Sequence, residues 1–549
     1  MTFDQLLRVD RRRCMVAGRV ALAVAWFQLL LIAPNHPHAL TGRALWLLPL
    51  ELPAILVLMV AAPRPTRSLL AWILGVLMAG VMFTKVADLS ANAALARDFN
   101  WLLDAHLIVA AFSFLKGVIG LPGAGAAGLA AVAVLAGVAW ITRRASGALA
   151  EAVPALGRRR ALALALLVTA GYGAVAGQRW VQPSVYPPVE AFTAKLALAH
   201  VREVRRSWDD LARFRRAAAT DPLATVPSDR LFADLGRRDV LLTFVESYGR
   251  SAVTDPRYRS RTRAALEGLR AAARSRGLGI RSAWLEAPTV GGQSWLSHAS
   301  MLSGLWIDTQ QRYEALLQSD RLALTHLFGR AGWRRVAAMP AITRAWPDGA
   351  YYDYDRLYDE AGLDYAGEPF NWVTMPDQYT LATLSRRELN APRRIPVFAE
   401  IAMISSHAPW TPIPPVLPWD RIDGGAVFDR WATGGDPPAE VWADPQRVRR
   451  QYGKAIRYVL DTLAAFVADK LPRGAVLIVL GDHQPAPVVT GPDATRQVPV
   501  HIVAPPAVLA RLDRWGWTRG ARPSGDAPVW RMDALRDRLV AAFTPGVTP

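Results

Sequence analysis

Ser294 is the residue of this chain best placed to act as a nucleophile. It follows the glycine pair Gly291 and Gly292, which predicts a tight loop, and it opens Ser294–Ser303, which we expect to be a short helix. Free backbone N–H groups and the helix dipole stabilise negative charge at a helix N-terminus, so an alkoxide and an incoming phosphate are both favoured there. The alternative is that Ser294 only caps the helix.

Two acidic groups and a histidine follow predicted strands. Glu246 comes directly after the apolar run Val240–Val245, and Asp482 and His483 follow Ala475–Leu480 after one glycine. Short continuous apolar runs are typical of buried parallel strands, and ligand sites form at the carboxyl ends of such strands. Carboxylate oxygen together with imidazole nitrogen suits zinc or manganese. Taken singly, each of these groups could equally be a structural or solvated loop residue.

A fourth group, His407, stands in a proline-flanked loop after the strand-like run Val397–Ile404. Alone it could be an ordinary loop histidine. Because the carboxyl ends of parallel strands meet at one edge of a sheet, we expect all four motifs to converge on one site.

The elements that must position these groups form an α/β domain over residues 238–510. We expect a mostly parallel sheet with helices on both faces. The tail, residues 511–549, contains Val529–Phe543, which is predicted to be an amphipathic helix packed on the domain or on a membrane.

The first part of the chain, residues 1–178, has the composition of a transmembrane domain. Hydrophobic residues make up 52% of the 549 residues, and before about residue 180 they form long runs with few charges. A transmembrane helix needs about 20 mainly apolar residues. Five runs qualify: Cys14–Pro34, Ala44–Ala62, Ser68–Ala87, Gly123–Ile141 and Arg160–Gly177. A shorter run, His106–Gly120, contains Lys116 and is interpreted as interfacial or re-entrant.

Basic residues predict the orientation of these spans, because they gather on the cytoplasmic side. Five crossings leave every arginine cluster in the cytoplasm, whereas six would put one cluster outside. The clusters are Arg8, Arg11, Arg12 and Arg13; Arg64 and Arg67; and Arg143, Arg144, Arg158, Arg159 and Arg160. The chain after Arg179 is then extracytoplasmic, and we expect the protein in a bacterial inner or cytoplasmic membrane.

A connector, residues 179–237, joins the two regions. Its stretch Val189–Ala218 mixes apolar residues with six arginines at helical spacing. A basic amphipathic helix beside a membrane commonly lies on the bilayer surface, but a helix packed on the soluble domain fits the pattern equally well.

Charge and cysteine content exclude other classes of protein. The net charge is +18, but the arginines of the first third lie between apolar runs and those of the remainder alternate with acids. This distribution favours contact with anionic lipid over nucleic acid. The single cysteine, Cys14, excludes an intramolecular disulfide and a CxxC metal site.

Residues 238–510 resemble the sulfatase-like branch of the alkaline phosphatase superfamily. Within it they look most like membrane enzymes such as lipoteichoic acid synthase and the phosphoglycerol and phosphoethanolamine transferases, which also place several spans before an extracytoplasmic domain. The resemblance implies that Glu246, Ser294, Asp482 and His483 bind one divalent ion (Mn, Zn or Mg). It implies that Ser294 is the catalytic nucleophile and that His407, also catalytic, contacts the substrate phosphate. Through a looser alignment, the resemblance also implies that Arg344 and Trp346 contact the substrate headgroup.

This chain departs from the sulfatase motif C/S-x-P-x-R. Leu302–Gly304 matches the Leu-Thr-Gly that ends the motif, and in that register Leu296 replaces the proline and His298 replaces the arginine. The signal for formylglycine formation is therefore absent, and a true sulfatase is disfavoured. His298 lies one helical turn after Ser294, so it faces the same way and is a candidate substrate-binding residue, although a core histidine is the alternative.

The resemblance implies a transferase that moves a phospho-alcohol headgroup, phosphoglycerol or phosphoethanolamine, from a membrane phospholipid to a glycan or lipid acceptor of the cell envelope. A phospho-serine would be the intermediate. A phosphodiesterase using water as acceptor is the first alternative, and a catalytically silent membrane scaffold is the second.

Overall fold

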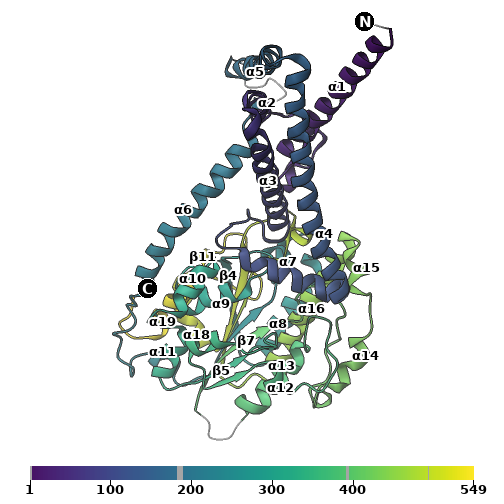
Figure 1. Cartoon of the computed structure of the whole chain (residues 1–549). Helices are drawn as coiled ribbons and strands as arrows, with labels where there is room; N and C mark the ends of the chain where they lie inside the picture. Colours follow the sequence, from purple (N-terminus) through teal and green to yellow (C-terminus); the bar gives the residue numbers. More distant parts are fainter. Residues whose placement is uncertain (1–2, 182–188, 391–394, 492–493, 549) are drawn as a thin grey trace. The chain divides into compact units, whose positions relative to one another are not determined.

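The computed structural model describes residues 3–181, 189–390, 395–491 and 494–548. The chain divides into two compact units (Figure 1). One comprises Met1–Ala93 and Arg97–Trp208, and the other comprises Ala94–Ala96 and Asp209–Pro549. We call them the helical unit and the α/β unit.

The helical unit contains four helical segments that are long and apolar enough to cross a membrane, within the residues described. These segments are Cys14–Ile32, Arg64–Leu95, Ile119–Pro154 and Arg158–Gln178. They lie in α1 (Phe3–Ile32), in the 3₁₀ helix Arg64–Thr66 together with α3 (Arg67–Leu95), in α4 (Ala105–Leu156) and in α5 (Arg158–Val181).

The predicted second span, Ala44–Ala62, is not a full-length helix. The structure has a short 3₁₀ helix, Gly42–Trp46, a two-residue strand β1 (Leu48–Pro49) paired with β2 (Val189–Glu190), and only then α2 (Glu51–Ala61). The 11 residues of α2 rise about 16 Å, roughly half the hydrocarbon thickness of a bilayer. The prediction of five full-length spans was therefore wrong. The pairing of Leu48–Pro49 with β2 prevents the first half of this run from being helical.

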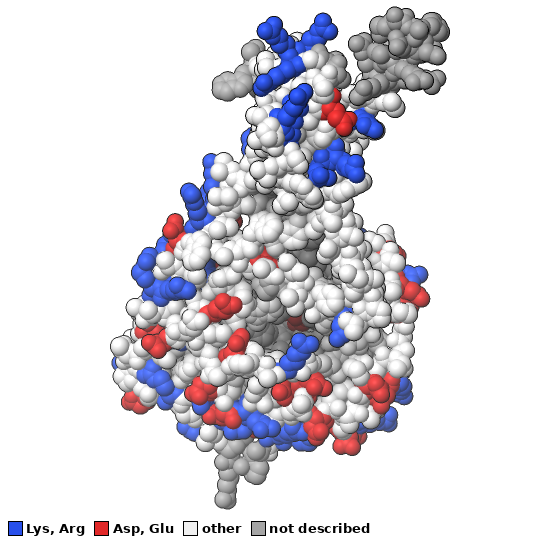
Figure 2. Space-filling view, in the orientation of Figure 1, with Lys and Arg blue, Asp and Glu red and all other residues white. Residues whose placement is uncertain are grey.

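Two of the predicted basic clusters lie at the same end of the helical unit. The guanidinium of Arg67 donates to the carbonyl oxygens of Ala62 at 3.0 Å and of Ala150 at 3.5 Å. The guanidinium of Arg158 donates to Ala61 at 3.1 Å. Figure 2 shows lysine and arginine gathered at this end of the helices. The chain thus returns to one basic face before α3 and again before α5. The side of the membrane on which this face lies stays a prediction.

The run His106–Gly120 forms the first part of α4, and a break separates it from the span that follows. Gly120 has φ +76° and ψ 168°, which no helix contains, and Pro122 follows it. Its position at a membrane surface stays a prediction.

The α/β unit is built on a nine-stranded sheet of order β10-β4-β9-β8-β3-β7-β5-β6, with β11 beside β4. The strands from β8 through β6 run parallel, whereas β9 is antiparallel to both β8 and β4. This confirms the expected mostly parallel sheet. The strands are β3 (Val240–Val245), β4 (Gly279–Glu286), β5 (Arg334–Ala338), β6 (Arg356–Tyr358), β7 (Val397–Met403), β8 (Val476–Gly481), β9 (Gln497–Ala504), β10 (Thr518–Arg519) and β11 (Val529–Arg531).

Helices cover both faces of this sheet. Figure 1 shows α8 (Arg259–Ser275) and α16 (Pro445–Asp469) on one side of the strands and α9 (Ser294–Ser303), α11 (Leu324–Arg330) and α19 (Ala534–Phe543) on the other. All residues of β3 and β8 are buried, which is why these strands are continuous apolar runs. The remaining helices are α7 (Arg250–Thr254), α10 (Gln310–Leu317), α12 (Glu360–Leu363), α13 (Asp377–Leu384), α14 (Asp429–Ala432), α15 (Pro438–Trp442), α17 (Pro487–Thr490) and α18 (Pro506–Ala510).

The C-terminal segment is part of this core. The helix expected over Val529–Phe543 begins only at Ala534, because Val529–Arg531 pairs with β4 as a parallel strand. The helix packs on the α/β unit through its apolar face and through Arg536, whose fully buried guanidinium forms an ion pair with Asp221.

The connector helix α6 (Phe192–Ala218) confirms the predicted helix over Val189–Ala218 except at its start, where Val189–Glu190 form β2. Its C-terminal turns pack on the α/β unit, since Phe214 and Ala218 are buried among residues of α9 and α10. Its earlier turns leave Leu198, Val201 and Trp208 exposed. Packing on the domain is thus established for the end of the helix only, and contact of the rest with a membrane surface stays a prediction.

Candidate active site

The sheet brings the predicted strand-end groups together. β3 pairs in parallel with β8 on one side and β7 on the other, with Val245 opposite Gly481 and Met403. Glu246 and the Asp482–His483 pair therefore leave the sheet at neighbouring positions of one edge, and the loop that follows β7 leaves it there too. Gly481 has no room for a side chain, since a Cβ would lie 1.9 Å from the carbonyl oxygen of Tyr248.

Ser294 is the first residue of α9, and its hydroxyl points into this group. Ser294 Oγ donates to Glu246 Oε2 at 3.0 Å and lies 3.2 Å from His483 Nε2. The preceding residues Gly291, Gly292 and Gln293 all have positive φ, and this tight turn aims the start of α9 at the sheet edge. The N-cap position belongs to Gln293, so Ser294 does not serve as the cap. Its hydroxyl instead contacts the carboxylate of Glu246 and the imidazole of His483.

Glu246, Asp482 and His483 form a group that could hold a metal ion. One ligand atom from each lies within 4.8 Å of the others. His483 Nδ1 lies 2.9 Å from the carbonyl oxygen of Gln484, to which it can only donate, so Nε2, which faces Glu246, is the nitrogen available to bind a metal ion. Asp482 Oδ1 accepts from the backbone N–H of Ser247 at 2.8 Å, so the carboxylate is held in place. The donor set, two carboxylates and one neutral imidazole beside a hydroxyl, fits a divalent cation.

The charges of these groups depend on one another. Burial disfavours the ionised form of Glu246, but the charge and hydrogen bond of His483 and the charge of His407 outweigh burial and hold the Glu246 pKa well below its ordinary value. Burial and the Glu246 charge raise the pKa of Asp482. Burial alone would lower the pKa of His483, but the charges of Asp482 and Glu246 outweigh burial and raise this pKa to about 9. Without a metal the cluster holds a proton on His483, which a bound cation would displace.

His298 is held by a partner that the sequence motifs did not include. Its Nδ1 lies 2.7 Å from Oε1 of Glu400, and its ring stacks on Phe244 with centroids 3.7 Å apart. The other carboxylate oxygen of Glu400 accepts a hydrogen bond from the hydroxyl of Tyr354. The His298 side chain is only 14% exposed and Glu400 is buried. His298 is therefore neither a free surface residue nor a purely apolar core residue, because its Nδ1 lies within hydrogen-bond distance of the buried carboxylate of Glu400.

His407 is exposed at the same sheet edge. Its Nδ1 is 2.5 Å from the carbonyl oxygen of Ala408, so Nε2 is the nitrogen left for a substrate. The loop that carries it is anchored by Asp377, whose Oδ1 accepts from the backbone N–H groups of Ile404 at 2.6 Å and Ser405 at 3.0 Å. Burial raises the pKa of Asp377 to about 7, although these hydrogen bonds lower it.

Arg344 and Trp346 are not brought into this group by any contact of the described residues. Arg344 is exposed, and Trp346 stacks on Tyr352 with ring centroids 5.8 Å apart. Their role in binding a headgroup stays a prediction.

Glu400 and Asp377 are the residues near the site that sequence reasoning missed. Glu400 is a charged residue in the middle of the otherwise apolar strand β7, and that interruption was a usable signal. Asp377 opens α13 after Pro376, and nothing in its neighbourhood distinguishes it from an ordinary first-turn acid.

Comparison with known proteins gives structural similarity only. No profile of a known protein family matches the sequence, and no curated protein sequence matches it. Three solved structures of similar fold are a lipoteichoic acid synthase, a periplasmic domain and a phosphoglycerol transferase.

The lipoteichoic acid synthase LtaP of Listeria monocytogenes is 13% identical, with a TM-score of 0.35, and the match covers 58% of this chain and 75% of that one. The C-terminal periplasmic domain of EptC of Escherichia coli, solved in complex with zinc, is 13% identical, with a TM-score of 0.37 and coverage of 57% and 85%. The phosphoglycerol transferase GacH of Streptococcus pyogenes, in complex with sn-glycerol-1-phosphate, is 12% identical, with a TM-score of 0.35 and coverage of 61% and 91%. These similarities are remote.

Proposed function

We propose that this protein is a membrane-bound, metal-dependent transferase that moves a phospho-alcohol headgroup from a phospholipid to an acceptor of the cell envelope. The observation that carries the proposal is the position of the Ser294 hydroxyl, 3.0 Å from Glu246 and 3.2 Å from His483 at the N-terminus of α9. A serine that only capped the helix would direct its hydroxyl at the backbone N–H groups of the first turn, whereas the Ser294 hydroxyl contacts two candidate metal ligands.

The reaction would proceed in two displacements on phosphorus. Ser294 Oγ attacks the phosphodiester, the Oγ–P bond forms, and the P–O bond to diacylglycerol breaks. The hydroxyl of Ser294 is oriented by its hydrogen bond to Glu246 Oε2. Ser294 loses its proton to solvent as the Oγ–P bond forms, and the leaving diacylglycerol oxygen takes up one proton from solvent, so the protons balance. An acceptor hydroxyl then attacks the phospho-serine and restores Ser294. The free N–H groups at the start of α9 are placed to stabilise the charge on the phosphoryl oxygens.

Glu246, Asp482 and His483 would hold the divalent ion together with the Ser294 oxygen. When bound, such an ion lowers the pKa of the serine hydroxyl and offsets charge on the phosphoryl group. Zinc, manganese and magnesium all remain candidates, although the imidazole ligand favours the first two. His407 would contact the phosphate from the rim through Nε2, and His298, Arg344 and Trp346 would bind the substrate.

The proposal places the α/β unit outside the cytoplasmic membrane. The four apolar helical segments supply the anchor, and the basic residues at one end of the helical unit would face the cytoplasm. A phospholipid of the outer leaflet is then the donor, and a glycan or lipid of the envelope is the acceptor.

Incubation of the purified full-length protein with headgroup-labelled phosphatidylglycerol and phosphatidylethanolamine tests the proposal. A transferase releases diacylglycerol and moves the label to an added acceptor, and the reaction stops when a chelator removes the metal. Labelled glycerol phosphate or ethanolamine phosphate as the only product would show a hydrolase that uses the same site. Protein that neither binds metal nor consumes lipid would indicate a silent scaffold and would refute the proposal.

A further inference from the structure

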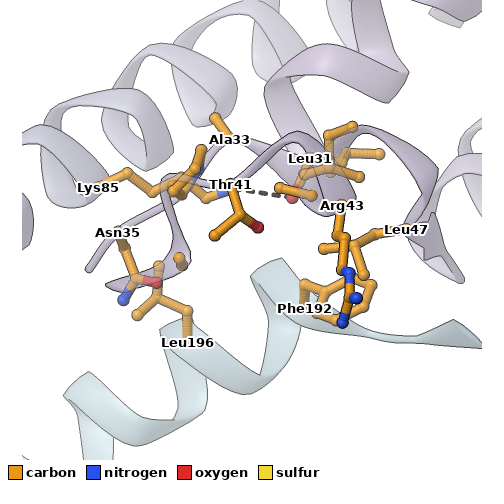
Figure 3. A pocket seen from close by; sticks show the side chains of 13 residues that line it. Leu31, Ala33, Asn35, Thr41, Arg43, Leu47, Lys85, Phe192 and Leu196 are labelled. Carbon is orange, nitrogen blue, oxygen red and sulfur yellow. Dashed lines mark hydrogen bonds between the residues drawn. The ribbon is translucent and has the colours of Figure 1, made fainter. Parts of the chain in front are cut away.

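The first turns of α6 are held against the end of an apolar helical segment. Thr193 Oγ1 donates to the carbonyl oxygen of Leu31, next to the last residue of α1, at 3.3 Å. Phe192 and Leu196 line a small cavity together with Leu31 (Figure 3). One side of these turns is therefore fixed to the helical unit, and the opposite side faces the surroundings of the helices.

Two further contacts give the depth of α6 relative to the basic end of the helical unit. The backbone N–H of Ala194 donates to Glu51 Oε1 at 2.8 Å, and Glu51 lies about 15 Å along α2 from that end. His200 Nε2 lies 3.2 Å from Asp88, which is about 32 Å along α3 from Arg67 at that end. The hydrocarbon core of a bilayer is about 30 Å thick. The first turns of α6 thus lie at the depth of one leaflet, the outer one in the predicted orientation.

The residues that α6 exposes change along the helix in step with this depth. From Phe192 to Val201 the only charged side chain besides His200 is Lys195, which pairs with Glu190 at 2.6 Å. The other exposed residues of this part are Ala194, Ala197, Leu198, Ala199 and Val201. The following part, residues 202–216, has six arginines and three acids, and it exposes Trp208. Apolar side chains followed by arginine and tryptophan are the order expected of a helix that leaves the hydrocarbon core through the headgroups.

We propose that α6 enters the outer leaflet at an oblique angle, with the exposed side of Ala194–Val201 among the acyl chains and Arg202, Arg205 and Arg206 at the lipid phosphates. Figure 1 shows the early part of α6 inclined to α3, as such an entry requires. Lipid is the occupant because this part of α6 is bonded to the apolar segments at leaflet depth, and because phosphate oxygens accept from guanidinium groups.

This placement differs from a helix that lies flat on the membrane surface. A flat helix would expose apolar residues along one face over its whole length, at a single depth. The oblique helix instead has a deep apolar end and a shallow basic end. The inference concerns the anchor of the protein and does not depend on the proposed function.

Spin labels at three positions of α6 measure its depth in nanodiscs of phosphatidylcholine and phosphatidylglycerol. The chain has one cysteine, so Cys14→Ser gives a background into which Ala194→Cys, Val201→Cys and Trp208→Cys are introduced singly. These three residues are exposed, so a label does not disturb packing, and their spacing of seven places them on one side of the helix. Access of oxygen, which partitions into lipid, relative to access of a water-soluble nickel chelate gives the depth of each label.

Two exposed positions elsewhere supply the references: Leu129→Cys in α4 for acyl chains and Ala264→Cys in α8 for water. We expect position 194 to resemble the first reference and position 208 to approach the second. The two positions are about 21 Å apart along the helix, so their depths should differ by about 10 Å. Equal depths would show a flat helix. Three labels in water would show no membrane contact, and low access of both reagents would show a protein partner. Each of these results would overturn the proposal.

A double variant tests the contact with phosphate. Arg202→Leu combined with Arg205→Leu removes two groups that hold α6 at the headgroups, so the label at position 208 should move inward by about one helical turn, roughly 5 Å. The matched control, Arg215→Leu combined with Arg216→Leu, removes two exposed arginines beyond Trp208 and should leave the depth unchanged. No movement in the first variant, or equal movement in both, would contradict the placement of Arg202 and Arg205 at the phosphates.

Discussion

His298 Nδ1 lies 2.7 Å from Oε1 of Glu400, a carboxylate buried in the middle of strand β7. Glu400 is held from its other side by the hydroxyl of Tyr354. A buried carboxylate is costly unless it is paired, so the arrangement fixes the orientation of the His298 ring one turn after Ser294. We therefore predict that Glu400 positions His298 for the proposed reaction.

Glu400→Gln should lower kcat for headgroup transfer by about tenfold to a hundredfold, because it replaces a charge-assisted hydrogen bond worth about 1.5–3 kcal/mol. KM for the lipid should change much less if His298 acts in the transition state. Metal content, measured by elemental analysis, should stay the same. The matched control is Glu388→Gln, since Glu388 is also buried but pairs with Arg334 away from the site. Equal losses in both variants would point to a general structural effect.

Metal affinity should rise with pH. His483 binds metal as neutral imidazole, and its pKa is raised to about 9 in the metal-free cluster because Asp482 and Glu246 outweigh the effect of burial. Asp482 also holds its proton more tightly than usual. Binding must therefore release protons, and the apparent affinity falls as pH drops below about 9. Isothermal titration with zinc or manganese in buffers of different ionisation enthalpy measures both quantities. Affinity that does not vary between pH 6 and 9 would contradict this ligand set.

Asp377 should make the stability of the α/β unit depend on pH. Its folded pKa of about 7 lies above the unfolded value of about 3.9, so its stabilising contribution is present below about pH 4 and is lost as pH rises through 7. Asp377→Asn keeps an acceptor for Ile404 and Ser405 but cannot ionise. The Tm of this variant relative to the parent should therefore increase between pH 5 and 8. A constant difference would show that Asp377 does not titrate in this range.

Asp377→Ala tests the anchoring role of the same residue. It leaves the backbone N–H groups of Ile404 and Ser405 without their acceptor and should destabilise the unit by about 2–4 kcal/mol at pH 5. The destabilisation should be smaller at pH 8, where the parent has lost the stabilising contribution of the protonated Asp377. Because His407 follows in the same loop, activity should fall more in this variant than in Asp377→Asn. Full activity in the alanine variant would separate the loop from catalysis.

The parts of the fold that depend on local pattern were predictable from the sequence. The run Val240–Val245 is β3, and Ser294–Ser303 is α9, because a continuous apolar run and a glycine-led helix start are local signals. The convergence of Glu246, Asp482 and His483 also followed, since parallel strands end at a common edge.

The parts that depend on pairing between distant segments were not predictable. Leu48–Pro49 pairs with Val189–Glu190, and this contact keeps part of an apolar run from becoming a span. Val529–Arg531 joins β4 and shortens the expected final helix. The bond between His298 and Glu400 joins residues 102 positions apart, and no periodicity in one sequence reveals such a partner.

The most direct test of Ser294 as the nucleophile is the capture of its covalent intermediate. Full-length protein is mixed with headgroup-labelled phospholipid in the absence of acceptor, quenched in acid, digested and analysed by mass spectrometry. The site predicts a phospho-alcohol adduct on Ser294, no adduct and no turnover in Ser294→Ala, and retained metal in that variant. The matched control Ser297→Ala changes a buried serine of the same helix and should keep the adduct. Turnover of lipid by Ser294→Ala, or an adduct on another residue, would contradict the account.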